Sequence, residues 1–236
     1  MKKNTAFLFA ALAAMAMISC ASVSASERVT AKEVGVQLSD LLRPEAMRVV
    51  INGDSAWVTA TGSSLDGVRV ESMKLRAKLK NSGRKATPTD KTGLAALIES
   101  SEGELILLER DVNTYFKGHG GVKGFSDLTF DFASTGFTAQ SSFSADFLNG
   151  LNVPLTATGK LGLRSDGVYL QDTNISLAGL IQVGSASSFI VDRINPLLSF
   201  KSLPFPVTFR TLTMDSDKVS LTGSPTPILA GDVWTK

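Results

Sequence analysis

The sequence predicts an α+β fold in which long antiparallel strands dominate and a few helices cover them. Long runs of the second half, such as 128–132 and 137–147, alternate between apolar and polar residues. Such alternation is typical of strands with one buried and one solvated face. Turn signals such as Asp66-Gly67 separate the runs. Apolar residues at helical spacing occur only in short segments, chiefly 30–42 and 188–200.

Composition limits the classes of function. The chain has 236 residues, of which 43% are hydrophobic and 19% charged, and its formal net charge is +2. This apolar fraction supplies one sizeable core and argues against a disordered chain. The near-zero charge argues against a nucleic-acid partner. With one Cys and one His, the chain lacks the ligands of a His/Cys metal site, and we expect no metal and no cofactor.

The N-terminus has the features of an export signal. Two lysines precede an apolar run, residues 7–18, that is too short to span a bilayer comfortably. The tripeptide that ends at Ala25 resembles a signal peptidase site. Residues 1–25 are therefore predicted to be a signal peptide, and residues 26–236 a single domain in the periplasm or cell envelope. This mature chain would contain no cysteine.

A lipoprotein is the alternative. Met17-Ile18-Ser19-Cys20 is close to a bacterial lipobox, in which Cys20 would be the lipidated first residue, although such boxes usually have Leu where Met17 stands. One acyl chain anchors a protein marginally, whereas several anchor it firmly. The choice between cleavage after Ala25 and lipidation of Cys20 thus decides whether the protein diffuses. No later segment has the length and apolarity of a membrane-spanning helix.

The first half of the mature chain is predicted to start with an amphipathic helix at 30–42. Thr30 is its expected cap, and Pro44 ends it. The elements expected after it are strands near 47–51, 57–61, 68–80 and 105–108, an exposed loop at 81–93, a segment at 94–100 that fits either a helix or a strand, and a helical turn at 109–117.

The second half is predicted to be a meander followed by one helix and two strands. The helix, 188–200, has an apolar stripe, and Pro196 is expected to bend it. The expected strands are 128–132, 137–147, 151–163 and 168–177 before the helix, and 205–214 and 218–222 after it.

The apolar faces of these strands have two interpretations. Helices or a second sheet would cover them in an ordinary core. Because few helices are available, a curled sheet could instead enclose a cavity or groove for acyl chains. Alternation alone does not distinguish a filled interior from a hollow one. The candidate lining residues are Phe130, Phe132, Phe137, Phe143, Phe147, Leu155, Phe189, Ile190 and Ile194.

A basic tract occupies residues 66–91. Its outward-facing side chains on the predicted strand are Lys74, Arg76, Lys78 and Lys80. They are candidates for docking to anionic headgroups or a membrane surface, where each basic residue adds up to about 1 kcal/mol. The alternative is a solvated strand face that resists edge pairing.

We find no catalytic constellation. His119, the single histidine, lies between glycines without a partner of fixed geometry. Glu109 and Asp111 could form an acid/base pair, but carboxylates at a helix start are favoured as caps and dipole partners. Asn113 is predicted to bond the helix to the sheet. The glycine-rich segment 118–124 matches neither a dinucleotide loop nor a P-loop.

Several motifs in order resemble one family. They are Gly103–Phe116, Val153–Leu161, and the C-terminal series Ile194-Asn195-Pro196-Leu197-Leu198, Leu203-Pro204-Phe205-Pro206-Val207 and Val219-Ser220-Leu221-Thr222-Gly223. In this order they are similar to the LmeA-like phospholipid-binding family, across nearly the whole mature chain. The resemblance implies an elongated, strongly curved antiparallel sheet wrapped against helices, related in shape to tubular lipid-binding domains. It also implies an exported protein that binds phospholipid through acyl chains, with no catalytic residues to carry over.

The expected function is therefore a non-enzymatic lipid binder or carrier of the cell envelope, with phospholipid and a membrane surface as partners. The alternative is a structural or assembly factor that docks a partner protein, not identified by the sequence, through its apolar face. A lipid hydrolase is the third candidate, but the sequence shows no nucleophile–base pair for such an enzyme.

Overall fold

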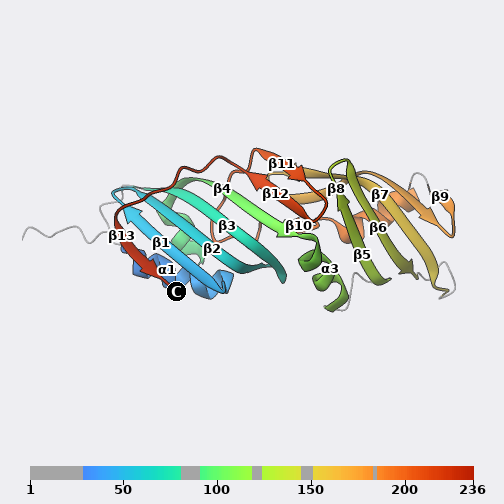
Figure 1. Ribbon diagram of the computed structural model, residues 1–236, viewed down its shortest axis with the longest axis horizontal. Coiled ribbons are helices and arrows are strands. Elements are labelled where there is room, and N and C mark those ends of the chain that lie inside the picture. Colours follow the sequence, from blue (N-terminus) through green and yellow to red (C-terminus); the bar gives the residue numbers. More distant parts are fainter. Residues whose placement is uncertain (1–28, 81–90, 119–123, 145–150, 183–184) are drawn as a thin grey trace, which may run out of the picture.

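The chain forms two antiparallel sheets joined side by side along one long axis (Figure 1). This computed structural model describes residues 29–80, 91–118, 124–144, 151–182 and 185–236. Within these ranges the fold is α+β, with mostly antiparallel strands and four helices, as the sequence predicts. The predicted export signal, Cys20, His119 and Phe147 lie outside the described residues.

The first sheet has seven strands in the order β11-β12-β4-β3-β2-β1-β13. Alternation gives its strands two distinct faces: on β3, Met73 and Leu75 are buried, while Lys74 and Arg76 point to the outer face. The strands are β1 (Ala46–Asn52), β2 (Ser55–Leu65), β3 (Val68–Leu79), β4 (Ile98–Leu108), β11 (Thr211–Met214), β12 (Lys218–Thr222) and β13 (Asp232–Thr235).

The second sheet is a strongly curled half-barrel in the order β10-β8-β7-β6-β5, with β9 on part of β8. Its four long strands follow each other as a meander, as predicted. The strands are β5 (Phe125–Ala133), β6 (Gly136–Phe143), β7 (Val153–Arg164), β8 (Gly167–Leu177), β9 (Leu180–Gln182) and β10 (Leu198–Ser199).

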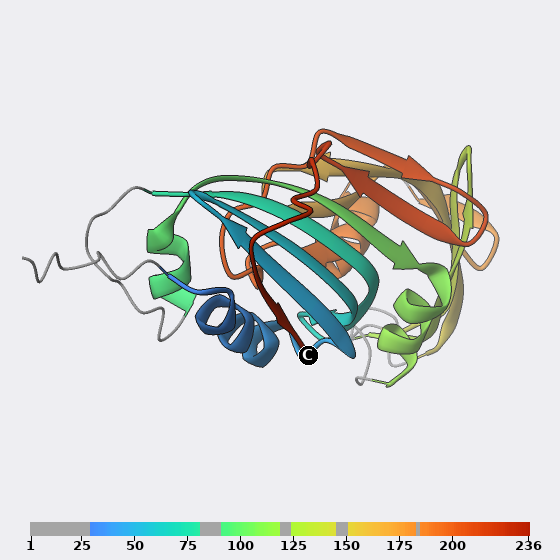
Figure 2. The same cartoon turned by 60° about the vertical axis from the view of Figure 1, so that its left-hand side comes forward.

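Four helices cover or connect these sheets. Helix α1 (Ala31–Leu42) begins with the predicted Thr30 cap, completed by Glu33 as a capping box, and lies beneath β1 and β2 (Figure 2). Helix α2 (Lys91–Leu97) packs against α1 and β4. Helix α3 (Glu109–Gly118) connects β4 to β5, and α4 (Ser185–Ile194) lies against β8.

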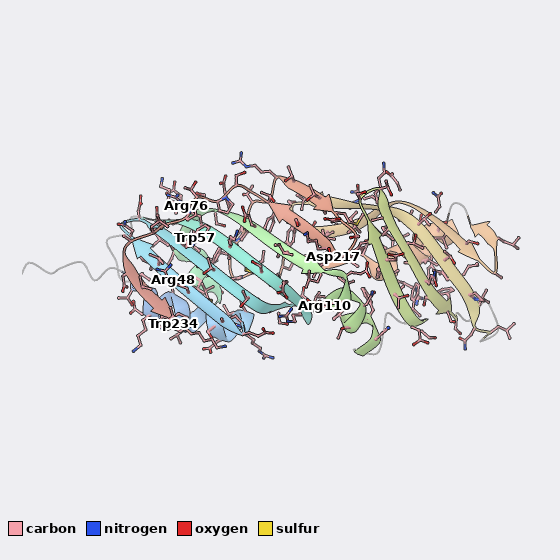
Figure 3. All side chains as sticks on the ribbon, in the orientation of Figure 1. Arg48, Trp57, Arg76, Arg110, Asp217 and Trp234 are labelled. Carbon is pink, nitrogen blue, oxygen red and sulfur yellow. The ribbon has the colours of Figure 1, made fainter. Side chains whose placement is uncertain are left out.

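One apolar cluster continues from the seven-stranded sheet into the half-barrel. It includes Leu38 of α1, Leu75 of β3, Phe116 of α3 and Phe143 of β6. A small separate cluster of Val50, Trp57 and Ile228 lies on the outer face of the seven-stranded sheet. Figure 3 labels Trp57 beside Arg76, which follows from their paired positions on β2 and β3.

The structure decides one segment that the sequence left open and corrects two predicted boundaries. The segment 94–100 divides into the end of α2 and the start of β4. The predicted helix 188–200 ends at Ile194, so Pro196 follows the helix instead of bending it. Of the predicted strand 205–214, only Thr211–Met214 is a strand. No helix among the described residues has the length and apolarity needed to cross a bilayer.

Candidate functional site

An open groove of about 310 Å³ lies where α2, the β7–β8 turn and the segment between β10 and β11 meet. Volumes of roughly 300–1,000 Å³ are usual for small-molecule sites. The lining is mostly apolar and rich in proline. It consists of Ala95, Ser165, Asp166, Phe200, Lys201, Leu203, Pro204, Phe205, Pro206 and Val207.

The segment 200–210 is held in place by the edge of β4. The Thr208 amide donates to the Ser101 carbonyl (3.0 Å), and the Gly103 amide donates to the Thr208 carbonyl (3.3 Å). The Ser101 hydroxyl also donates to the Pro206 carbonyl. A side chain at Gly103 would collide with Val207, so this glycine permits the close approach. These contacts fix the apolar wall of the groove.

A second hollow, which we call the slot, lies between α1, α2 and the inner face of β2 and β3. Every lining residue is apolar: Val34, Leu38, Ala56, Val58, Ala77, Leu79, Leu94, Leu97, Ile98 and Phe205. Phe205 lines the slot and the groove, so the two hollows are neighbours. The slot measures only about 10 Å³, barely enough for one water molecule. An apolar guest would enter it only if α2 or Phe205 moved.

The groove has few polar groups, and they come from its rim. Asp166 accepts a hydrogen bond from the Tyr169 hydroxyl (2.8 Å). That bond raises the pKa of Tyr169 above its ordinary value of 10.0. The Arg164 guanidinium lies over the Tyr169 ring, 4.4 Å from its centre. Lys201 supplies the cationic side chain of the lining.

The predicted phenylalanines lie inside the half-barrel and pack on one another. Phe130, Phe132, Phe137 and Phe143 are all buried. The ring centres of Phe130 and Phe137 are 5.8 Å apart, and those of Phe130 and Phe132 are 6.2 Å apart. None of these four lines the groove or the slot. Their contacts are those of a filled core.

The remaining apolar candidates separate into buried and exposed positions. Leu155 of β7 and Ile190 and Ile194 of α4 are buried and belong to the same apolar cluster. Phe189 is 43% exposed, and the Arg193 guanidinium lies 4.3 Å from its ring centre. These residues do not line the groove or the slot either.

The predicted basic stripe on β3 faces an acidic stripe on β4. Lys74 bonds Glu104 (2.9 Å) and Lys78 bonds Glu99 (3.2 Å). Arg76 stands opposite Glu102 in the register and donates to the Thr226 carbonyl (3.0 Å). These contacts favour the structural interpretation of the stripe, since three of its four cations have partners within the protein. Lys80, just after β3, is exposed.

An ion network joins the seven-stranded sheet to α3. Arg69 of β3 contacts Glu45, Glu71 and Asp111 at 3.0, 2.6 and 3.0 Å. The hydrogen bond from Arg69, together with its charge, holds the pKa of Glu45 below its ordinary value of 4.5. Hydrogen bonds to Glu45 and Glu71 raise the pKa of Arg69. Asp111, the most buried of the three acids, is thus paired.

The remaining candidates on α3, Glu109 and Asn113, have structural contacts. Glu109 accepts a hydrogen bond from the Phe132 amide (2.6 Å). Asn113 accepts from the Phe130 amide (2.7 Å) and donates to the Phe130 carbonyl (2.8 Å), so the predicted helix-to-sheet bond is confirmed. In the described ranges, no group of three or more His, Cys, Asp or Glu could hold a metal ion.

Sequence reasoning missed the groove because three distant segments form it. In the sequence, the Leu203–Val207 motif resembles part of a family pattern, and its end falls in the predicted strand 205–214. Its two prolines between apolar residues are the one local signal, since proline disfavours a regular central strand.

Comparison with models of protein families, with curated proteins and with solved structures finds no match for this chain.

Proposed function

We propose that this protein is an exported, non-enzymatic phospholipid-binding or carrier protein of the bacterial cell envelope. The observation that carries the proposal is the groove of about 310 Å³ beside a wholly apolar slot, with Phe205 shared between them. Acyl chains gain roughly 0.8 kcal/mol for each CH₂ group removed from water. A site with apolar walls and few polar groups therefore suits a hydrocarbon chain.

In this proposal one acyl chain lies along Phe205 in the groove. Outward movement of α2 extends the site into the slot, because Leu94 and Leu97 of this short helix form one of its walls. The headgroup stays at the rim, where Lys201 offers a positive charge to the phosphate.

The first test is the lipid content of the purified mature protein. We expect native mass spectrometry and solvent extraction to find co-purified phospholipid, and the delipidated protein to take up a fluorescent phospholipid from detergent micelles. A monomer that carries no lipid and takes none up would contradict the proposal.

A matched pair of variants locates the site. Ala95 lines the groove, whereas Ala96, the next residue of α2, is exposed and does not line it. Ala95→Trp fills the groove and should weaken uptake about tenfold, while Ala96→Trp should leave uptake unchanged. Equal uptake by both variants, with unfolding midpoints like that of the wild type, would exclude this groove as the lipid site.

The small size of the slot and the filled half-barrel favour a second candidate, a structural or assembly factor that docks a partner protein. It predicts a lipid-free monomer that binds one envelope protein. The uptake experiment separates the two candidates directly.

A further inference from the structure

One end of the half-barrel exposes large apolar side chains. Leu151, just before β7, is 67% exposed, and Leu180, at the start of β9, is 71% exposed. They belong to the same end because Leu155 pairs with Leu177, which also pairs with Leu180. The Ala178 amide also donates to the Pro154 carbonyl (2.8 Å). In Figure 1 this end, marked by β9, is one extremity of the long axis.

Two stretches that form much of this end contain no charged residue. Residues 147–159 and 173–191 contain no Asp, Glu, Lys, Arg or His. The described parts of these two stretches include the start of β7, the end of β8, all of β9 and most of α4. The outer face of the seven-stranded sheet is the opposite case, because it carries cross-strand ion pairs. These two stretches therefore differ in charge from the outer face of the seven-stranded sheet.

A third exposed apolar side chain of the half-barrel is Phe189 of α4, the helix that follows β9 in the chain. Its ring is 43% exposed, and the Arg193 guanidinium stacks on it. An exposed aromatic ring with a cation beside it suits the boundary between hydrocarbon and headgroups, where the ring is buried and the cation remains near phosphate.

We propose that this apolar tip, defined by Leu151 and Leu180, inserts into the surface of a phospholipid bilayer and docks the protein there, with Phe189 of α4 at the headgroup boundary. The inference rests on the proposed function and moves the docking surface from the basic stripe to the tip. A bilayer fits better than a protein partner, because the side chains project from strand ends instead of forming a broad face. Insertion also removes no charged side chain of these stretches from water.

The test is flotation of the mature protein with vesicles of phosphatidylcholine alone and of phosphatidylcholine mixed with phosphatidylglycerol. We expect the wild type to float with both, and salt to have little effect. Leu151→Glu/Leu180→Glu should lower the partition coefficient at least about tenfold. Leu229→Glu is the matched control: Leu229 is 86% exposed but lies in the C-terminal segment before β13, and this variant should float like the wild type.

Uptake of fluorescent phospholipid from detergent micelles separates this inference from the proposed function. The double variant should keep normal uptake and a normal unfolding midpoint, since both leucines are exposed. Normal uptake with undiminished flotation would overturn the apolar tip and leave the lipid-binding function standing. Binding only to the anionic vesicles, with release by salt, would show that basic side chains and not the apolar tip dock the protein to the membrane. Self-association that disappears in the double variant, without vesicle binding, would assign the tip to a protein contact.

Discussion

Single asparagines attach helices and loops to sheet edges in two places. Asn113 of α3 bonds both backbone groups of Phe130 on β5. Asn195, just after α4, accepts from the Leu170 amide (2.8 Å) and donates to the Leu170 carbonyl (3.3 Å) on β8. A carboxamide carries a donor and an acceptor and so replaces a missing neighbouring strand. In both places it covers a strand edge that would otherwise present unpaired backbone groups.

Removal of the Asn113 amide tests this role. Asn113→Ala leaves the amide and the carbonyl of Phe130 without these partners, and we expect the free energy of unfolding to fall by about 1–3 kcal/mol. Urea denaturation followed by circular dichroism measures the change. The control is Thr114→Ala, because the Thr114 hydroxyl is exposed and bonds within its own helix, and this variant should stay within about 0.5 kcal/mol of the wild type. Equal midpoints for the two variants would show that the Asn113 bonds contribute nothing.

The Arg69 ion pair predicts a specific pH dependence. Arg69 lowers the pKa of Glu45 below 4.5, so this contact stabilises the folded state above that pH. The contribution is lost as the pH falls through the folded-state pKa. An NMR titration of the Glu45 carboxyl should give a pKa below 4.5 in the wild type and a return toward 4.5 in Arg69→Met. Lys74→Met should not move it, and identical titrations in the wild type and Arg69→Met would contradict the assignment.

At the scale of elements, β3 and β4 form a ladder of opposite charges. Lys74 faces Glu104 and Arg76 faces Glu102 in the strand register. Pairs of this kind contribute roughly 0.2–1 kcal/mol. The ladder supports the register of two long strands, and its acidic side chains pair with Lys74 and Lys78 of the basic stripe.

A charge exchange across this ladder tests the pairing. Lys74→Glu places two carboxylates opposite each other, and Glu104→Lys places two ammonium groups opposite each other. Each single variant should lose about 0.5–1 kcal/mol of stability, and Lys74→Glu/Glu104→Lys should recover most of the loss. Urea denaturation at low ionic strength measures all three. Losses that simply add in the double variant would mean that the two side chains do not interact.

Local patterns predicted the elements that local chemistry determines. Thr30 and Glu33 cap α1 from within one turn, and the alternation of Val68–Leu79 was evident along the strand itself. The irregular segment 200–210 was not predictable, because its shape depends on bonds such as that from Ser101 to Pro206, 105 residues apart. Its Phe, Val and Thr residues favour strands, but packing on the edge of β4 overrides that preference. The groove depends on the same contacts.

At the scale of the whole molecule, α3 connects the two sheets. Asp111 binds Arg69 of the seven-stranded sheet, while Glu109 and Asn113 bind β5 of the half-barrel. Phe116 packs in the apolar cluster that extends through both sheets, with its ring centre 5.4 Å from that of Phe130. A shared cluster bridged by one helix predicts that the sheets unfold together.

A core substitution in the half-barrel, read by probes in the other sheet, tests this cooperativity. The chain has two tryptophans, and both Trp57 and Trp234 belong to the seven-stranded sheet. Phe143→Leu, at a fully buried position of β6, should cost about 1–2 kcal/mol. We expect the tryptophan fluorescence midpoint in urea to fall together with the circular dichroism midpoint. Phe189→Leu, at a partly exposed position, should move neither. An unchanged fluorescence midpoint, together with a dichroism transition that splits into two steps, would show that the sheets unfold independently. In that case the loss of the Phe143 ring would destabilise the half-barrel alone.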